Sequence, residues 1–474
     1  MNPNVSGLPL VEELSPAPDA KDVFLRWADL PRCLFLDSAA RDDRLGRYSF
    51  VAADPFDSLT TSSESGDALA ELARRMEAFP AAAVEGLPPF QGGAAGVFGY
   101  DLGRQLECVP PPRRDEFEVP LASVGMHDVV AAFDHQQDRA WLISHGFPEQ
   151  EPVARRRRAA ERLASFRERL ESKDPAWKPS RPAPSARDVP WDRLATQHAV
   201  SDLPNLTSNF DRDGYLKAIE RAIEYVRAGD VFQVNLAQRL LYPAADDPIS
   251  LYLRLRERNP APFAGYLDLG EFQIVSASPE RFLEVSGGHV ETRPIKGTRR
   301  RVGRPEADLF GGDELLASRK DRAENVMIVD LLRNDLSKVC RPESVAVTEL
   351  CRVENYQYVQ HLVSQVVGEL QSGRGPLDLL RAAFPGGSIT GAPKPRAMEI
   401  IAELEPTARG PYCGSLGYLG FDGSWDSNIL IRTVTSGRGW LQFPVGGGIT
   451  AASNPREEYE ETWDKAEGIL RSLR

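Results

Sequence analysis

Cysteine is scarce in this sequence, and no two cysteines stand close enough together to form a CxxC pair. The five that occur are Cys33, Cys108, Cys340, Cys351 and Cys413. An odd number of scattered cysteines indicates neither a disulfide framework nor a zinc knuckle. We therefore expect a protein of a reducing compartment, the cytoplasm.

Long hydrophobic runs and an excess of positive charge are also missing. No apolar stretch approaches the ~20 residues that a membrane-spanning helix needs. The first residues, MNPNVSGLPLVEELSP, lack the basic head and apolar stretch of a signal peptide. With 57 Lys and Arg against 69 Asp and Glu, the net charge is −12. Because nucleic-acid-binding proteins usually carry a basic excess, we expect neither a membrane nor a nucleic acid as partner.

The remaining composition is that of a globular protein, and a length of 474 residues predicts two to four domains. Three regions differ in pattern. Residues 8–147 alternate short β-rich runs with turns and contain one amphipathic helix at 67–79. Residues 148–206 predict a charged, solvated helix followed by a Pro-rich linker. Residues 207–474 contain most of the motifs and form the predicted catalytic domain.

Strands and helices do not alternate strictly along the third region. The patterns predict helices at 211–229, 313–339 and 454–473. They predict strands at 231–243, 265–279 and 282–295, and strands with tight turns over 410–449. This order disfavours a parallel sheet built from βαβ units. We therefore predict an α+β fold, in which layered antiparallel sheets are flanked by helices.

Two of the predicted helices carry carboxylates beside their apolar stripes. On the closing helix, Glu461 lies at the edge of the buried face, one turn before Lys465, and this spacing also predicts a simple ion pair. On the long helix, Glu324 shares a face with Ile328 and Leu331. A carboxylate there is either paired or coordinating, because an isolated buried charge is too costly. Two glutamates with open positions left over suit Mg²⁺ better than zinc.

Three further features could carry chemistry, although each also has a purely structural explanation. Glu280 follows a predicted strand, where burial would raise the pKa of its carboxyl and suit a general acid, or where it pairs with Arg281. His361 lies in the apolar run YVQHLVSQVV, as core histidines do. The loops PGGSITGAPKPRAM and PVGGGIT offer backbone N–H groups to an anion, or simply form tight turns.

Taken together, these motifs resemble the chorismate-utilising enzymes, the family of the anthranilate, aminodeoxychorismate, isochorismate and salicylate synthases. The matching stretches run in family order over residues 207–470: SPERF, PIKGTRRR, KDRAENVMIVDLLRNDL, QHLVSQV, PGGSITGAPK, RGPYCGSLGY, NILIRT and GGGITAASNPREEYEETWDKA. RYSFVAADP and GGAAGVFGYD resemble the amino-terminal half of the amine-forming members. The resemblance implies the fold of anthranilate synthase component I and an enzyme that acts on chorismate.

The resemblance also implies roles for individual residues. Glu324 and Glu461 match the carboxylates that hold Mg²⁺ in the family. Glu280 matches the acid that protonates the departing C4 hydroxyl, and His361 matches an active-site histidine. The positions that match contacts to the substrate are Thr298, Ser388, Tyr412, Arg432, Gly447, Gly448 and Lys465.

Two positions distinguish the types within the family. Gln233 stands where the water-using isochorismate and salicylate synthases carry a basic lysine, so the resemblance favours ammonia as the incoming group. Lys296, in PIKGT, stands where the anthranilate type has alanine and the aminodeoxychorismate type has lysine. In the latter type this lysine is proposed to attack C2 of chorismate. We expect Arg293, Arg299 and Arg300, together with Mg²⁺, to lower its pKa; the alternatives are an anion clamp or a surface charge.

The resemblance therefore favours the component I type of aminodeoxychorismate synthase, which forms 4-amino-4-deoxychorismate for p-aminobenzoate and folate. The chain contains no G-x-C-x-G nucleophile loop, so we expect the ammonia to come from a separate glutamine amidotransferase subunit. Anthranilate synthase component I and a non-catalytic chorismate-binding subunit stay open as alternatives. FLDSA at 35–39 partly resembles the segment that lines the family's tryptophan-binding pocket, and departs from it at two positions.

Overall fold

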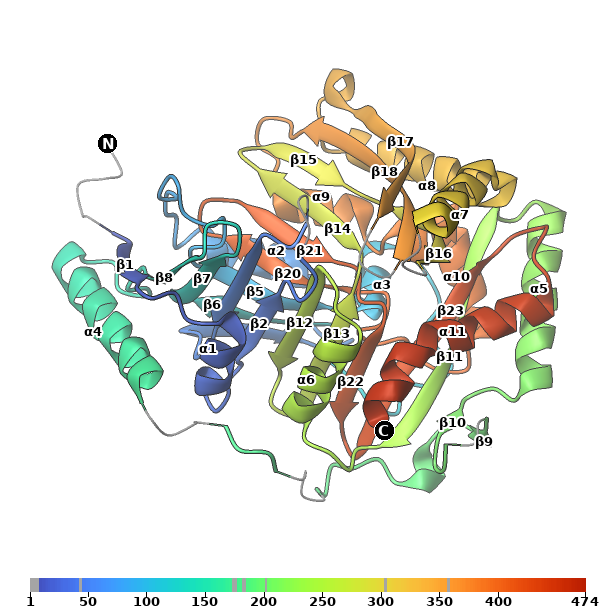
Figure 1. Cartoon of the computed structure of the whole chain (residues 1–474), viewed down its shortest axis with the longest axis horizontal. Coiled ribbons are helices and arrows are strands. Elements are labelled where there is room, and N and C mark those ends of the chain that lie inside the picture. Colours follow the sequence, from blue (N-terminus) through green and yellow to red (C-terminus); the bar gives the residue numbers. More distant parts are fainter. Residues whose placement is uncertain are drawn as a thin grey trace.

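Two antiparallel sheets pack face to face at the centre of the protein, and helices cover their outer sides (Figure 1). The computed structural model describes residues 8–41, 45–172, 177–180, 185–200, 203–301, 305–355 and 359–474. Within these ranges the layered α+β architecture that we predicted is confirmed. No helix in the described residues has the length and apolar character needed to cross a membrane.

The first sheet runs from the amino-terminal strand to the two short strands β10 and β9. In order across the sheet, its strands are β1 (Leu10–Leu14), β8 (Arg139–Ser144), β7 (Val129–Asp134), β3 (Tyr48–Ala52), β2 (Leu34–Asp37), β12 (Phe263–Asp268), β13 (Phe272–Ser278), β22 (Thr433–Gly437), β23 (Trp440–Ile449), β11 (Gln233–Pro243), β10 (Thr207–Ser208) and β9 (His198–Ala199), with β19 (Gly391–Ala392) paired to β11.

The second sheet also combines strands from both ends of the chain. Its order is β16 (Ile295–Arg300), β18 (Val359–Glu369), β15 (His289–Thr292), β14 (Arg281–Ser286), β21 (Trp425–Asn428), β20 (Ser415–Gly420), β5 (Gly93–Phe98), β6 (Ala122–His127) and β4 (Asp57–Thr61), with β17 (Ala346–Asn355) paired to β18. The regions 8–147 and 207–474 are therefore interleaved in space. The boundaries of these two regions, and the linker at 148–206, remain predictions from the sequence.

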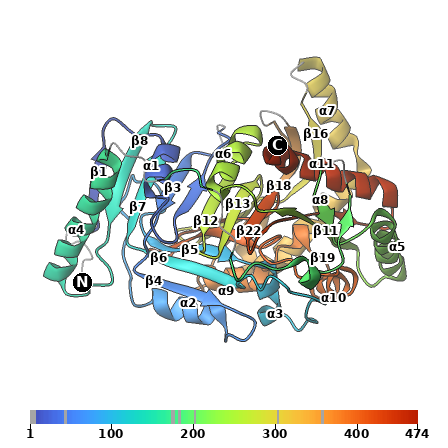
Figure 2. The ribbon, with the colours of Figure 1, turned by 90° about the horizontal axis from the view of Figure 1, so that it is seen from below.

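Helices bury the outward-facing side chains of both sheets. The outer face of the first sheet is covered by α1 (Ala20–Trp27), α4 (Pro152–Glu171), α6 (Pro248–Arg258) and α11 (Pro455–Leu473). A second cluster joins the other sheet and β11 to α2 (Ala68–Met76), α5 (Arg212–Ala228), α8 (Arg319–Ser337), α9 (Pro376–Ala383) and α10 (Lys394–Leu404). Two further helices are α3 (Gly103–Leu106) and α7 (Pro305–Ala317). α4 lies at one end of the molecule and α5 at the other (Figure 2).

The alternation of side chains along each strand produces these layers. On β3, Phe50 joins the cluster between the two sheets, where it meets Tyr418 of β20 at a ring-centroid distance of 5.6 Å. The next residue, Val51, points the other way and packs with Phe24 of α1. A period of two residues therefore divides one strand between two separate cores.

The helix ends test the predictions made from local sequence. The closing helix begins as predicted, because the Asn454 side chain accepts a hydrogen bond from the Arg456 N–H at 3.0 Å. α5 ends as predicted at Gly229, whose φ of 85° favours glycine. The single helix predicted over 313–339 is wrong, since the chain forms α7 and then α8. Ser318 divides them: its side chain accepts the Asp321 N–H at 3.2 Å and caps a new helix start.

Two buried histidines make the stability of this fold sensitive to acid. His127 and His145 are 1% and 2% exposed, and burial lowers the pKa of each to about 4. Unfolded chains bind these protons near pH 6.5, whereas the folded protein does not until about pH 4. The contribution of these two histidines to stability is therefore present in full above about pH 6.5, and it is lost as the pH falls from 6.5 toward 4.

We expect His145→Gln to reduce this acid sensitivity. Between pH 7 and pH 5 the wild-type free energy of unfolding should lose roughly 2 kcal/mol through this one histidine. The variant should lose correspondingly less, whatever its stability at pH 7. Urea unfolding at several pH values measures the slope, and equal slopes for the two proteins would contradict the argument.

Candidate active site

Two of the three predicted catalytic residues, Lys296 and Glu280, come from separate elements and meet at Ser388. Lys296 lies on β16, Glu280 lies between β13 and β14, and Ser388 lies in the 3₁₀ turn Gly387–Ile389. The Lys296 Nζ donates to the Ser388 carbonyl at 2.9 Å, and the Ser388 hydroxyl donates to Glu280 Oε1 at 2.9 Å. One serine therefore holds an amine and a carboxyl group on the same side of the loop.

Burial shifts the pKa of the amine and of the acid in opposite directions. Burial raises the pKa of Glu280, which is 5% exposed, although the charge of Lys296 opposes the shift. Burial also lowers the pKa of Lys296; Glu324 and Glu280 oppose this shift, and Lys465 adds to it. Both shifts favour the uncharged forms, which are a carboxylic acid able to give a proton and an amine with a free electron pair.

Burial, and not the neighbouring arginines, is the main cause of the lowered pKa of Lys296. We expected Arg293, Arg299 and Arg300 to have this effect. Arg293 instead forms an ion pair with Glu354, and Arg299 lies 3.5 Å from Glu314. The side chain of Arg300 is outside the part of the chain that the structure describes. The sequence predicted the direction of the shift, but named the wrong source.

Glu324 and Glu461 lie on two helices that approach Lys296 from different directions. α8, which carries Glu324, packs on β16 and β18, and α11, which carries Glu461, packs on β23. The charges of both carboxylates act on the ammonium groups of Lys296 and Lys320. Glu461 also forms the ion pair with Lys465 that its spacing predicted, at 2.7 Å. Although burial acts to raise the pKa of Glu461, Lys465 lowers it.

Glu324 has the property expected of a metal ligand. Its Oε1 is buried and has no hydrogen-bond partner among the described residues, and burial raises the pKa of its carboxyl. Such an oxygen is costly unless a cation completes it. In the described ranges, no group of three or more His, Cys, Asp and Glu is placed to hold a metal ion. The unpartnered oxygen of Glu324, with Glu461 as a second carboxylate, fits the donors that a hard cation such as Mg²⁺ takes.

The glycines of β23 leave room for buried polar groups. A Cβ added to Gly448 would lie 2.5 Å from the Gln233 Nε2, and one added to Gly447 would lie 3.2 Å from the Glu458 Oε2. Gln233 is fully buried, and within the described residues neither atom of its amide group has a hydrogen-bond partner. A neutral amide with both of its polar atoms unpartnered is suited to contact a small polar molecule.

The ion pair between Lys320 and Glu458 was missed by reasoning from the sequence. The Lys320 Nζ donates to Glu458 Oε1 at 3.2 Å, and that oxygen also accepts from the Ser453 hydroxyl at 2.7 Å. The pair joins α8 to α11 one turn before Glu324 and Glu461. Its only signal in the sequence was spacing, since Lys320 precedes Glu324 by four residues and Glu458 precedes Glu461 by three.

The other predicted residues come from β16, from β18 and from the segments just before β20 and β22. Burial, with help from Arg432, lowers the pKa of His361 to about 3, so its ring is neutral. Arg432 has a φ of 51°, a conformation that arginine rarely adopts, and such strain is common at functional sites. Thr298 pairs with His361 across β16 and β18, but its side chain lies outside the described atoms. Tyr412 is buried, with its ring 5.8 Å from the Arg409 guanidinium.

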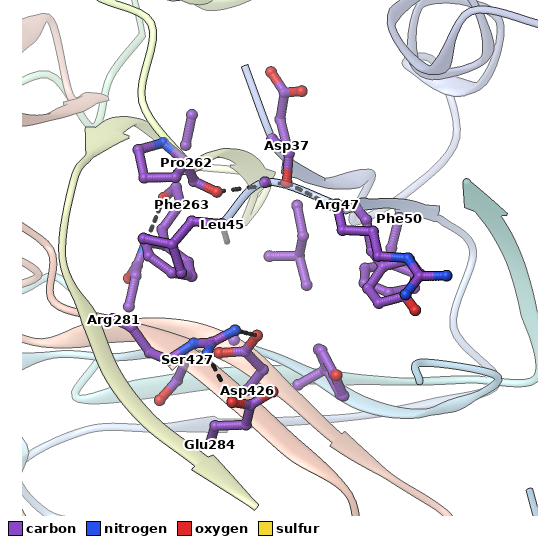
Figure 3. A pocket seen from close by; sticks show the side chains of 18 of the residues that line it. Asp37, Leu45, Arg47, Phe50, Pro262, Phe263, Arg281, Glu284, Asp426 and Ser427 are labelled. Carbon is purple, nitrogen blue, oxygen red and sulfur yellow. Dashed lines mark hydrogen bonds and ion pairs between the residues drawn. The ribbon is translucent and has the colours of Figure 1, made fainter. Parts of the chain in front are cut away.

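A separate cavity of about 470 Å³ opens between the two sheets. The residues described as lining it include none of the predicted catalytic or substrate-binding positions. Figure 3 shows Arg281 beside Glu284 and Asp426, to which its guanidinium donates at 2.6 and 3.0 Å. Asp37, from the FLDSA segment, also lines the cavity, but its carboxylate already accepts from Arg256 at 2.6 Å.

Comparisons with known proteins show the family of the chain. The model of a family described as chorismate binding enzyme matches residues 31–471. The chain is 40% identical to aminodeoxychorismate synthase component 1 of Salmonella typhimurium, over 98% of both chains. It is 42% identical to anthranilate synthase component 1 of Thermus thermophilus, over 95% of this chain and 94% of the relative.

Solved structures give the same result for the fold. The crystal structure of anthranilate synthase component I from Streptococcus pneumoniae superposes with a TM-score of 0.75 at 29% identity, and covers 90% of this chain and 93% of that one. The menaquinone-specific isochorismate synthase MenF of Escherichia coli has a TM-score of 0.71 at 19% identity, over 98% of this chain and 95% of its own. The second likeness concerns the fold alone.

Removing the unpartnered carboxylate should weaken cation binding. We expect Glu324→Gln to reduce the affinity for Mg²⁺ roughly 100-fold, because one of two charged ligands becomes a neutral amide. Isothermal titration with Mg²⁺ measures this directly. Glu457→Gln is the matched control, because Glu457 is an exposed carboxylate on α11, the helix that carries Glu461. Equal affinities in both variants would exclude Glu324 as a ligand.

Proposed function

The chain belongs to the chorismate-binding enzyme family, and from this premise we propose that it is an aminodeoxychorismate synthase component I. It converts chorismate and ammonia to 4-amino-4-deoxychorismate, the precursor of p-aminobenzoate and folate. Relatives from Salmonella typhimurium and Bacillus subtilis carry this name, at 40% and 37% identity.

One observation carries this proposal: a lysine amine and a carboxylic acid share one serine. Lys296 and Glu280 contact Ser388 at 2.9 Å each, and burial favours the neutral form of both. The displacement of a hydroxyl group requires a nucleophilic amine and a protonated acid, and burial shifts the pKa of Lys296 and of Glu280 toward these forms. A lysine that only clamped an anion would gain nothing from a lowered pKa.

In the first step the Lys296 amine attacks C2 of chorismate. Its electron pair forms the N–C2 bond, the C1=C2 double bond moves to C1=C6, the C5=C6 double bond moves to C4=C5, and the C4–O bond breaks. The departing oxygen takes the proton of Glu280 and leaves as water. The carboxylate then recovers a proton from the new secondary ammonium, so that the acid is restored.

In the second step ammonia attacks C4, and both ring double bonds return to C5=C6 and C1=C2. The N–C4 bond forms, and the C2–N bond breaks with its electron pair on the Lys296 nitrogen. The surplus proton passes from the new ammonium to the Lys296 amine, and 4-amino-4-deoxychorismate is released. The sum of both steps consumes chorismate and ammonia and produces the amine and water. Gln233 cannot act as a base, which suits ammonia as the incoming group.

The surrounding residues bind and orient a dianion. Glu324 and Glu461 would hold Mg²⁺, which neutralises charge on a substrate carboxylate when it is bound. Lys465 supplies positive charge beside Glu461, Arg432 supplies it near Glu280, and His361 offers a neutral ring. The remaining positions that we assign to substrate contacts are Thr298, Ser388, Tyr412, Gly447 and Gly448.

The ammonia is supplied by a second protein in this proposal. The name component 1, which several relatives carry, designates one part of a larger enzyme. We assign the other part to a glutamine amidotransferase subunit, and we place both in the cytoplasm. Free ammonium should replace that subunit in the assay.

Anthranilate synthase is the second candidate, because a relative at 42% identity carries that name. Lys296 disfavours it, because the resemblance gives the anthranilate type an alanine at this position. A third reading, a non-catalytic chorismate-binding subunit, is disfavoured because Glu280, Glu324, His361 and Glu461 are all present.

The product distinguishes these candidates. With chorismate, Mg²⁺ and ammonium, we expect no fluorescent anthranilate. The product should release p-aminobenzoate only after an aminodeoxychorismate lyase is added. Fluorescence without the lyase would favour anthranilate synthase, and chorismate left unchanged under every ammonia source would favour the non-catalytic subunit.

Replacing the nucleophile should abolish the amination at C4. We expect Lys296→Ala to lower the rate of aminodeoxychorismate formation roughly 100-fold or more, because the covalent step is lost. Some anthranilate-like product should appear, since ammonia can then attack C2. Lys217→Ala, which removes an exposed lysine from α5, is the matched control. Unchanged formation of aminodeoxychorismate by Lys296→Ala would exclude the nucleophilic role.

A further inference from the structure

The amino-terminal motif GGAAGVFGYD has no part in the chemistry above. Its last two residues, Tyr100 and Asp101, contact Arg409 and Gly410. The Tyr100 N–H donates to the Gly410 carbonyl at 2.7 Å, and the Gly410 N–H donates to Asp101 Oδ2 at 2.8 Å. The Tyr100 ring lies 4.5 Å from the guanidinium carbon of Arg409. Residues about 300 positions apart therefore form one contact, directed at Arg409 and the residue after it.

Arg409 carries this contact into the site. It is buried, and its guanidinium donates to both oxygens of Glu405, at 2.9 and 2.6 Å. It also donates to two backbone carbonyls, those of Asn235 at 2.8 Å and Ile389 at 3.2 Å. The Glu405 carboxylate in turn accepts the Ala237 N–H at 2.9 Å. The arginine thus ties β11 to the loop that contains Ser388.

That loop presents Ser388 to the reacting groups. The Ser388 carbonyl accepts from Lys296 at 2.9 Å and from the Asn235 side chain at 3.3 Å. The next carbonyl, of Ile389, is the one that Arg409 holds. Neighbouring peptide groups are therefore fixed from two sides, by the amine in the site and by the arginine behind it.

We propose that Arg409 is a positioning residue for the amination reaction. It holds the loop so that Ser388 keeps its carbonyl on Lys296 and its hydroxyl on Glu280. Tyr100 and Asp101 act through it, which gives the amino-terminal region a role in placing the catalytic groups. The inference rests on the proposed function, and deepens it by assigning residues that set the geometry of the acid and the amine.

The chemistry of arginine explains why this position needs it. A planar guanidinium with five N–H donors can serve a carboxylate and two carbonyls at once, whereas a lysine ammonium is a single point with three donors. Substituting lysine preserves the charge beside Glu405 but leaves a buried carbonyl without a donor. The loop is then free to move relative to Lys296 and Glu280.

Arg239 provides a matched control on β11. It is also buried, it pairs with Glu116 at 2.5 Å, and it lies 5.2 Å from the centre of the Phe117 ring. Arg409 and Arg239 therefore share a buried carboxylate and an aromatic face. The Arg239 side chain contacts Glu116 and Phe117, and within the described residues it makes no hydrogen bond to Ser388 or Ile389.

The first experiment compares Arg409→Lys with Arg239→Lys, using chorismate and ammonium. Both should lower the midpoint of thermal unfolding. Only Arg409→Lys should lower kcat, by roughly 10- to 100-fold, with the KM for chorismate changed less than threefold. Equal kcat losses in both variants, or a loss confined to thermal stability, would overturn the proposal.

A double-mutant cycle with Ser388→Ala tests the route of the effect. Ser388→Ala removes the hydroxyl on Glu280 but keeps the carbonyl on Lys296, so it tests the part of the effect that passes through the hydroxyl. The kcat of the double variant should then be higher than the product of the two single losses gives. Fully multiplied losses would mean that Arg409 does not act through the Ser388 hydroxyl. Should Arg409→Lys fail to fold, Asp101→Ala takes its place in the comparison and in the cycle, with an expected three- to tenfold loss of kcat.

A measurement without turnover separates this proposal from the proposed function. Acetic anhydride labels free amines, and mass spectrometry gives the labelling rate of Lys296. We expect this rate to rise at least threefold in Arg409→Lys and in Asp101→Ala, and to stay unchanged in Arg239→Lys. An unchanged rate would overturn the positioning role. A wild-type enzyme that makes another product would overturn the function but leave this result intact.

Discussion

The site depends on one hydrogen-bonded link, in which Ser388 connects Lys296 to Glu280. The Ser388 carbonyl accepts a hydrogen bond from the Lys296 amine, and the Ser388 hydroxyl donates one to the Glu280 carboxyl group. Both ionisable groups are drawn out of water to make these contacts, and burial therefore shifts their pKa values toward the neutral forms. The position of Lys296 and Glu280 beside Ser388 therefore accounts both for their burial and for the shifts of their pKa values.

The layered fold makes this placement achievable. Lys296 and His361 stand on adjacent strands of the second sheet, whereas Gln233 and the glycines Gly447 and Gly448 stand on adjacent strands of the first. Helices α8 and α11 then bring carboxylates from outside both sheets. No single element supplies more than a part of the site, so its geometry depends on how the two sheets pack together.

The interleaving of both sequence regions extends this dependence to the amino-terminal half. Tyr100 and Asp101 contact Arg409 and Gly410, and the Arg409 guanidinium lies 5.8 Å from the Tyr412 ring. Strand β5, just before Tyr100, is paired with β20, just after this turn. The amino-terminal region therefore supports the turn at Arg409 and Gly410 directly, through hydrogen bonds and the stacking of a ring on a guanidinium group.

The sequence by itself determined the fold class and the ends of helices such as α5 and α11, because periodicity and capping are local properties, and motif order let it propose the reacting residues. Asn454 and Gly229 could be read in this way. Only the tertiary structure decided that a buried site, and not nearby arginines, lowers the pKa of Lys296, and that Lys320 meets Glu458. Such effects depend on distances between elements far apart in the chain and on the exclusion of water, which no local pattern encodes.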